Sequence, residues 1–203
     1  MLRVRTLHRG TVSLLRDVQG AALLEFAITL PLLVVFVVGI FDFSGAFNQK
    51  QKIEQAAQEG AIIAGAQPMS DIAPGTGDPD SLHPVVIAVF NSLAGSGVLP
   101  SAGLSCTPPP PVPKRPTPPG LAWIYTISGC SSFTADNLVI TINRGWVCPA
   151  PCASGPPLAV GTMVTVAYPY HWRFNSVIQL LFPKAAYAAT TNLTENAAVQ
   201  NQM

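Results

Sequence analysis

The sequence predicts an α+β protein: a single N-terminal transmembrane helix continues into a long amphipathic helix, and a small antiparallel sheet domain follows. Two observations predict the helices, an apolar run over residues 21–41 and small apolar residues at helical spacing from there to residue 66. A third predicts the sheet, because three later segments alternate apolar and polar residues as strands do. The 203 residues suffice for one such domain with an appendage.

The charge distribution predicts how the chain is oriented. Only 10% of the residues are charged, against about 25% in an ordinary soluble domain, and 49% are hydrophobic. Residues 1–20 contain four arginines and one aspartate, and form a basic leader that the positive-inside rule places in the cytoplasm. The chain after Phe41 is then expected to lie outside the cytoplasm. The rest of the chain has slightly more acidic than basic residues, so we expect no nucleic-acid partner.

Residues 21–41 are the predicted transmembrane helix. Twenty-one residues at about 1.5 Å each give about 31 Å, which matches a hydrocarbon core of about 30 Å. Glu25 is the one charged residue among them. A helix beginning after Glu25 would be short, at about 24 Å, so this carboxylate lies at or inside the membrane edge. A cleavable secretory signal is the alternative, but its apolar core is shorter, and residues 41–45 offer no convincing cleavage site.

Glu25 is the residue in this helix that needs an explanation. A carboxylate that takes up a proton or reaches the cytoplasmic interface is the simplest interpretation. An unpaired charge at the centre of a membrane helix costs a few kcal/mol, so an acid there is also a functional hypothesis whose partner should be named. No Lys or Arg lies within two turns of it in the span, which points to a partner on another molecule.

The helical pattern continues over residues 42–67 as an amphipathic extension, so that residues 21–66 are expected to form one helix of about 69 Å. Its polar positions are Lys50, Lys52, Glu54 and Glu59. One narrow face consists of Ile53, Ala56, Ala57, Gly60, Ala61 and Ala64. A face of such small residues suits close packing, either on a neighbouring molecule or on the chain's own domain.

Residues 68–203 form the predicted extracytoplasmic α+β domain. Pro and Gly residues make residues 68–83 a loop, and Pro84 suits the first turn of a short helix that ends near Leu93. Strands are expected over residues 121–128, 138–143 and 163–170. The tail from Ser176 has an apolar stretch over residues 177–182 and then polar residues, so its end is expected to be loosely held. The Pro-rich loop over residues 107–120 is more consistent with an exposed spacer than with a ligand for a proline-recognition domain.

All four cysteines follow the predicted span, where an oxidising compartment favours disulfides over zinc ligation with His171. They are Cys106, Cys130, Cys148 and Cys152, and four cysteines allow three pairings among which the sequence does not choose. The sequence contains no nucleophile elbow, phosphate-binding loop or His-Glu-x-x-His motif, and its three histidines show no ligand spacing. We therefore expect no catalytic residue, no metal, no cofactor and no enzyme activity.

A basic leader, a glycine and a glutamate as the fifth residue of an apolar helix resemble the precursors of type IV pilins. The stretch from Gly20 to Ala27 and the helix from Gln49 to Ala61 resemble more closely the TadE-like pseudopilins of the tight-adherence (Flp) pilus system. Residues 164–170 resemble them more weakly. The resemblance implies cleavage after Gly20 by a prepilin peptidase, which leaves Ala21 as the N-terminus. The freed α-amine, with an ordinary pKa of about 8, would then pair with Glu25 of a neighbouring subunit.

Two functions follow as expectations. The first is a pseudopilin-like structural or assembly component of a tight-adherence pilus in the bacterial inner membrane, with a cytoplasmic N-terminus and a periplasmic or extracellular C-terminal domain. Its partners would be inner-membrane lipid, a prepilin peptidase, other pilin or pseudopilin subunits and the pilus assembly machinery. The second is an unprocessed, single-pass, membrane-anchored binding or adhesion module. A cell-envelope enzyme whose site cannot be recognised in the sequence is a third, weaker alternative.

Overall fold

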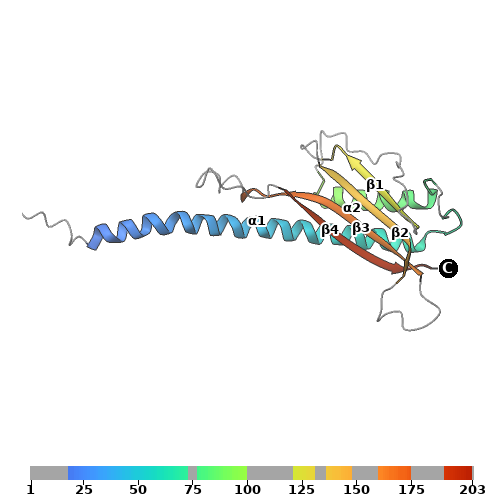
Figure 1. Ribbon diagram of the computed structural model, residues 1–203, viewed down its shortest axis with the longest axis horizontal. Helices are drawn as coiled ribbons and strands as arrows, with labels where there is room; N and C mark the ends of the chain where they lie inside the picture. The colour runs from blue at the N-terminus through green and yellow to red at the C-terminus, as the bar shows by residue number, and fades with distance from the viewer. Residues whose placement is uncertain are drawn as a thin grey trace, which may run out of the picture.

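The computed structural model describes residues 18–72, 77–99, 121–130, 136–147, 160–174 and 190–202. In chain order its elements are helix α1 (Val18–Ala66), a 3-10 turn η1 (Asp80–Leu82), helix α2 (His83–Gly95), and the strands β1 (Ala122–Ser128), β2 (Asn137–Val147), β3 (Val160–His171) and β4 (Thr190–Gln200). Figure 1 shows that α1 extends far beyond the domain, while α2 and the sheet gather around its C-terminal half. The predicted α+β class is therefore confirmed.

Helix α1 is continuous over 49 residues, a length of about 73 Å, and so confirms the expected long helix. Pro31 lies inside it without ending it. In the domain, α2 begins one residue before the expected Pro84 and ends two residues after Leu93. The basic leader before Val18 and the Pro-rich loop over residues 107–120 lie outside the described residues.

The four strands form one antiparallel sheet in the order β1-β2-β3-β4. All three expected strands are present. Strand β1 is one residue shorter than predicted, and β2 and β3 are longer than predicted. The expectation of a loose tail is wrong for residues 190–200, because these form β4 and pair with β3 from His171 to Gly161 without interruption. The odd-numbered side chains of β4 from Leu193 to Val199 are half-buried under α1, while the even-numbered ones are exposed.

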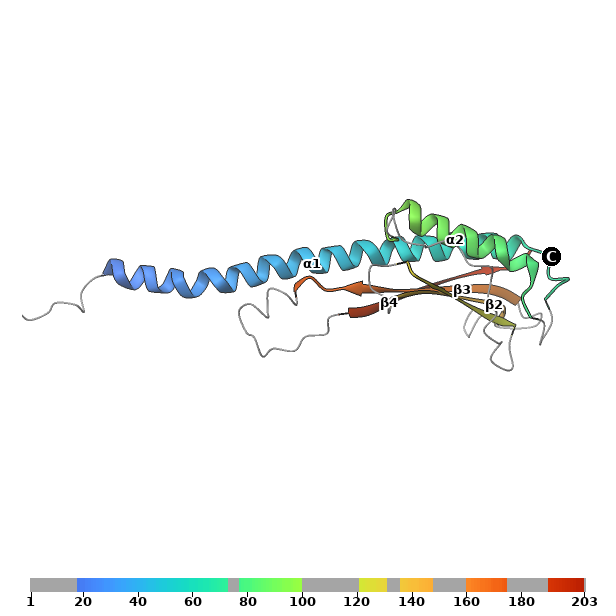
Figure 2. The same ribbon diagram turned by 90° about the horizontal axis from the view of Figure 1, so that it is seen from above.

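The two helices cover one face of the sheet, as Figure 2 shows from above. Alternate residues of the strands enter the core, as the sequence pattern indicated for Ile140, Ile142, Val164, Val166 and Tyr168. Large, fully buried side chains come from the first two strands, from η1 and from α2, and include Trp123, Tyr125, Ile127, Leu138, Leu82 and Leu93. The domain is therefore a two-layer structure in which helices supply one layer and the sheet the other.

The narrow face of small residues on α1 packs on the chain's own domain. Ile53, Ala56, Ala57, Ala61 and Ala64 are completely buried, in the same cluster as residues of α2 and β3. Gly60 lies at the closest approach, because a Cβ atom there would overlap the side chain of Val89 in α2 and lie 3.4 Å from that of Val164 in β3. A backbone that approaches two elements so closely needs glycine at this position.

The C-terminal end of α1 is held by Arg144, a buried residue that the sequence analysis did not single out. A bulge between Asn143 and Trp146 in β2 interrupts the pairing with β3 at this residue. The guanidinium donates to the carbonyl oxygen of Gln67, just past the helix end, at 2.7 Å and to Thr162 Oγ1 at 3.2 Å. Burial lowers the pKa of Arg144 and Asp71 partly offsets this, but an arginine stays charged at neutral pH and a cation suits the end of a helix.

We predict that Gly60→Ala destabilises the domain by about 1–3 kcal/mol, because the added methyl group has to displace Val89 or separate α1 from β3. Gly95→Ala in α2 is the matched control, since nothing lies within 4 Å of a Cβ atom there. It should be neutral or stabilising by up to about 1 kcal/mol. The stability of both variants can be measured by thermal unfolding of the full chain in detergent, monitored by near-ultraviolet circular dichroism. Equal stabilities for the two variants would contradict the packing described for Gly60.

Candidate processing and membrane-attachment site

The N-terminal half of α1 presents apolar side chains that no part of the described protein covers. None of the most apolar window of this helix is buried. Its exposed large side chains include Leu23, Leu24, Phe26, Ile28, Leu32, Leu33, Phe36, Ile40 and Phe41. Apolar surface of this extent on all sides of a helix requires an apolar environment. Among the described residues this is the one helix long and apolar enough to cross a membrane, and it is a candidate membrane anchor.

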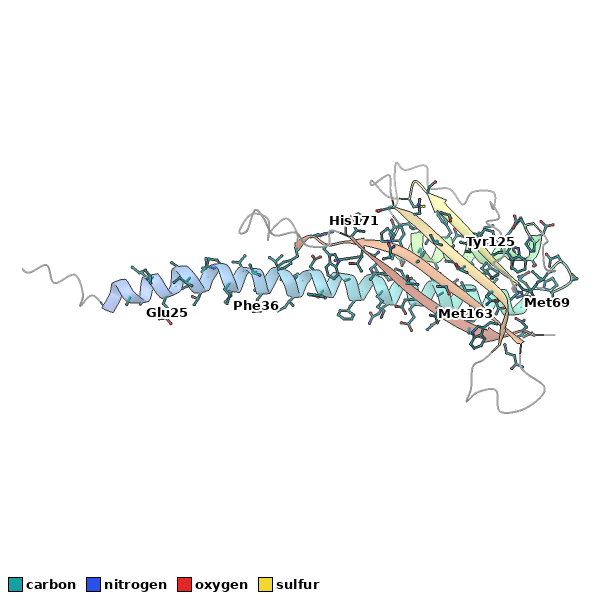
Figure 3. All side chains as sticks on the ribbon, in the orientation of Figure 1. Glu25, Phe36, Met69, Tyr125, Met163 and His171 are labelled. Carbon is teal, nitrogen blue, oxygen red and sulfur yellow. The ribbon has the colours of Figure 1, made fainter. Side chains whose placement is uncertain are left out.

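Gly20, Ala21 and Glu25 all lie in the first two turns of α1 and are exposed. Figure 3 shows Glu25 and Phe36 on the projecting part of the helix, far from Met69 at the opposite end of the domain. No side chain of the described residues forms a hydrogen bond or ion pair with Glu25. The structure thus brings these three residues together near one end of the described helix.

Aromatic side chains gather where α1 leaves its projecting part and reaches the domain. The ring of Trp172 lies 5.1 Å from that of Phe43 in α1 and 5.1 Å from that of Tyr170 in β3, both with edge-to-face geometry. The indole N–H of Trp172 donates to Thr191 Oγ1 at 2.7 Å. Trp and Tyr concentrate where a membrane protein passes from hydrocarbon to water, because their rings are apolar and their polar atoms reach hydrogen-bonding groups. The cluster lies just after the predicted span, which ends at Phe41.

Asp42, the residue after the predicted span, connects the end of β3 to α1. It is only 6% exposed. The Tyr170 hydroxyl lies 2.8 Å from its Oδ1, and the backbone N–H of Phe174 donates to its Oδ2 at 2.7 Å. Gly45, one turn later in α1, leaves room for this contact, since a Cβ atom there would lie 2.8 Å from the Tyr170 hydroxyl oxygen. Sequence reasoning missed this site because Tyr170 and Phe174 lie 128 and 132 residues after Asp42 in the chain.

Two of the three histidines, His83 and His171, lie among the described residues, and each has a carboxylate partner. His83 Nε2 lies 2.8 Å from Asp78 Oδ2, and His171 Nε2 lies 2.6 Å from Asp136 Oδ2. Over the parts of the chain that the structure describes, no three or more His, Cys, Asp or Glu residues cluster as metal ligands would.

Of the four candidate disulfide cysteines, the described residues include Cys130. Its side chain is completely buried and is not a free thiol. Its carbonyl oxygen accepts a hydrogen bond from the Tyr168 hydroxyl at 3.1 Å. Cys106, Cys148 and Cys152 lie outside the described residues, so the pairing of the four stays a prediction.

These features define a class of protein: an α+β protein in which the central helix of the domain continues into a candidate membrane anchor. A family model described as "TadE-like protein" matches residues 20–61, which contain Gly20, Glu25, Asp42 and Gly60. The resemblance inferred from the sequence is thereby confirmed over residues 20–61 of α1. No curated protein and no solved structure was found to match the chain.

The contact between Tyr170 and Asp42 predicts a pH dependence. Burial, the hydrogen bond to Asp42 and its charge raise the pKa of Tyr170 to about 12, from an ordinary value of about 10. A proton held more tightly in the folded state stabilises that state below the unfolded pKa, and this stabilisation is lost as the pH rises through the folded pKa. The folded domain should therefore lose stability between about pH 10 and pH 12.

Tyr170→Phe tests this dependence. The variant should be less stable by about 1–3 kcal/mol at pH 9, because Asp42 loses a hydrogen-bond donor. Its melting temperature should then fall less steeply than that of the wild type between about pH 10 and pH 12. Thermal unfolding of both proteins at a series of pH values measures the difference. If the melting temperatures of the two proteins fell in parallel over this pH range, Tyr170 would not be the source of the pH dependence.

Proposed function

We propose that this chain is a pseudopilin-like structural component of a tight-adherence pilus, which a prepilin peptidase processes after Gly20. The observation that carries the proposal is the N-terminal half of α1: it is apolar and uncovered, begins at a Gly-Ala junction, and presents one carboxylate, Glu25, without a partner in the described protein. The match of residues 20–61 to the TadE-like family supports it. We propose further that the chain has a structural role and is not an enzyme.

The position of Gly20 suits a cut at this point. The described part of helix α1 starts at Val18, two residues before Gly20. Glycine lowers helix stability and has no side chain to obstruct a peptidase. Cleavage there would leave Ala21 as a new N-terminus at the start of the apolar helix, with the rest of α1 intact.

The new α-amine gives Glu25 a natural partner. The amine is cationic at neutral pH, and each charge lowers the cost of placing the other in a medium of low dielectric constant. Glu25 lies four residues after Ala21 along the helix, and its own side chain has no partner within the described chain. An amine of one subunit bound to Glu25 of the next would fix the axial position of two packed anchor helices, which is the register role that we propose for Glu25.

The remaining parts of the proposal concern location. Four arginines in residues 1–20 support a cytoplasmic N-terminus, with the anchor in the bacterial inner membrane and the domain in the periplasm or outside the cell. In that oxidising compartment the buried Cys130 and the other three cysteines would form disulfides that stabilise the domain. The partners are then the prepilin peptidase, other pilin or pseudopilin subunits and the assembly machinery.

Intact mass tests the processing step. After co-expression with a prepilin peptidase, the wild-type chain should begin at Ala21, and Gly20→Leu should remain full-length because its side chain obstructs the cut. Gly39→Ala, in the same helix, is the matched control; a Cβ atom there comes no closer than 3.9 Å to Phe174, so processing should be normal. A wild-type chain that keeps residues 1–20 would contradict the proposal and favour an unprocessed, membrane-anchored binding module.

Glu25→Ala tests the register role. The variant should be cleaved as the wild type is, but its recovery in pili sheared from cells with the assembly machinery should fall by about tenfold or more, because a buried amine left without its partner costs several kcal/mol. Glu59→Ala is the control, since Glu59 is an exposed acid in the domain half of α1. Normal assembly of Glu25→Ala would refute the proposed pairing, and a loss in both variants would indicate a general effect of removing acids from α1.

A further inference from the structure

A stripe of large apolar side chains runs along one side of α1 and continues past the end of the predicted span. It consists of Phe36, Ile40, Phe43 and Phe47, which lie within an arc of about 60° because an α-helix turns by about 100° per residue. All four are exposed, and the two beyond the span are so by 52% for Phe43 and 63% for Phe47. Lys50 follows on the same side and ends the stripe.

The other sides of α1 become polar earlier, directly after Phe41, where Asp42, Asn48 and Gln49 lie. The apolar surface therefore extends six residues further on the side of the stripe, to Phe47. Six residues span about 9 Å along a helix whose diameter with side chains is about 10–12 Å. Because the hydrocarbon of a bilayer ends in a plane, an apolar surface with so oblique an end fits a membrane helix that is tilted toward the side of the stripe.

The depth of the two rings fits the headgroup layer of a membrane. Phe43 and Phe47 lie about 3 Å and 9 Å beyond Phe41 along the helix axis. The headgroup layer on each side of a bilayer is roughly 5–7 Å thick, so an upright helix would place Phe43 within it and Phe47 above it. A tilt of about 20° toward the stripe, the average for membrane helices, lowers Phe47 by about 2–3 Å and brings its ring into the layer. Trp172, whose ring lies 5.1 Å from that of Phe43, is of a residue type enriched in this layer.

A second copy of α1 is a poorer occupant for this stripe than lipid. Beyond Phe47 the same side of the helix carries the exposed residues Lys50 and Glu54. A copy packed along the stripe in the same membrane would bring equal charges together at both positions. Each of these residues is already engaged within its own chain, Lys50 with Glu195 at 3.2 Å and Glu54 with Gln58 at 3.4 Å. Lipid in contact with the stripe up to Phe47 leaves both charges in water.

We propose that Phe43 and Phe47 form a one-sided contact with the membrane surface, in which their rings enter the headgroup layer and α1 tilts toward the side that they occupy. A contact on one side of the helix fixes the rotation of α1 about its own axis. It thereby determines which side of the domain faces neighbouring molecules in the membrane. The inference rests on the membrane insertion of α1 in the proposed function, but not on cleavage after Gly20 or on assembly.

Photocrosslinking of the full-length chain in dioleoyl phosphatidylcholine vesicles tests this contact. The photoreactive aromatic residue p-benzoylphenylalanine replaces Phe47, Ile40 or Asn48, one position at a time. After irradiation, intact mass should show an adduct of one lipid for the Phe47 variant and for the Ile40 variant, whose position lies inside the predicted span. Asn48 is the matched control, because it is exposed at nearly the same height on another side of α1, and its variant should give no lipid adduct.

Three outcomes would overturn the inference. They are a covalent dimer of the Phe47 variant, which would place a second copy on the stripe, equal lipid adducts at Phe47 and Asn48, and no adduct at Phe47 when Ile40 gives one. Each of these leaves the proposed function standing. A chain without an adduct at Ile40 would instead contradict the membrane insertion on which both proposals rest. Near-ultraviolet circular dichroism shows that each variant is folded.

Polarised infrared spectroscopy on oriented bilayers tests the tilt itself. The dichroism of the amide I band should show α1 closer to the membrane normal in Phe47→Gln than in the wild type, because the polar side chain no longer favours the tilted position. Asn48→Gln, which replaces one exposed amide by another, should keep the tilt of the wild type. An unchanged tilt in Phe47→Gln would show that this ring does not set the position of α1 and would contradict the inference.

Discussion

The packing of the Ala/Gly face of α1 against α2 and β3 is the constraint on which the rest of the structure depends. Gly60 allows the helix to lie against two elements at once, and its neighbours on that face are completely buried. The same helix continues, unbroken, into a segment that no part of the described domain covers. The two halves of this helix therefore differ in their side chains. Residues 21–41 are apolar except for Glu25, and from Ile53 onward one face consists of buried, mostly small residues.

Two polar contacts fix the domain along this helix, one near each end of the part that it covers. At the membrane side, Asp42 holds the end of β3 through Tyr170 and Phe174. At the far side, Arg144 holds the residues just after α1 together with Thr162 of β3. Because both contacts connect the helix to the sheet, the domain is kept from sliding or rotating about its anchor.

The sequence predicts those features that depend on local pattern. The long helix, the helix beginning near Pro84 and three alternating strands follow from periodicity and turn residues, and the structure contains all of them. Strand β4 could not be predicted in this way, because its half-buried positions include Glu195, whose charge is compensated by Lys50 from α1 at 3.2 Å. Asp42 and Arg144 were missed for a related reason: their partners come from distant parts of the chain, and the bulge that interrupts β2 at Arg144 has no signature that a single sequence reveals.

The dual environment of α1 can be measured directly by placing spin labels along it in lipid vesicles and recording their accessibility to oxygen and to a water-soluble nickel complex. We predict that labels on all sides of the helix between Leu23 and Phe41 are highly accessible to oxygen and poorly accessible to the nickel complex. From Ile53 to Ala64 it predicts an oscillation with a period of about 3.6 residues, with labels on the buried face inaccessible to both reagents. High nickel access between Leu23 and Phe41, or no oscillation beyond Ile53, would contradict the claim that one helix is both the membrane anchor and the centre of the domain.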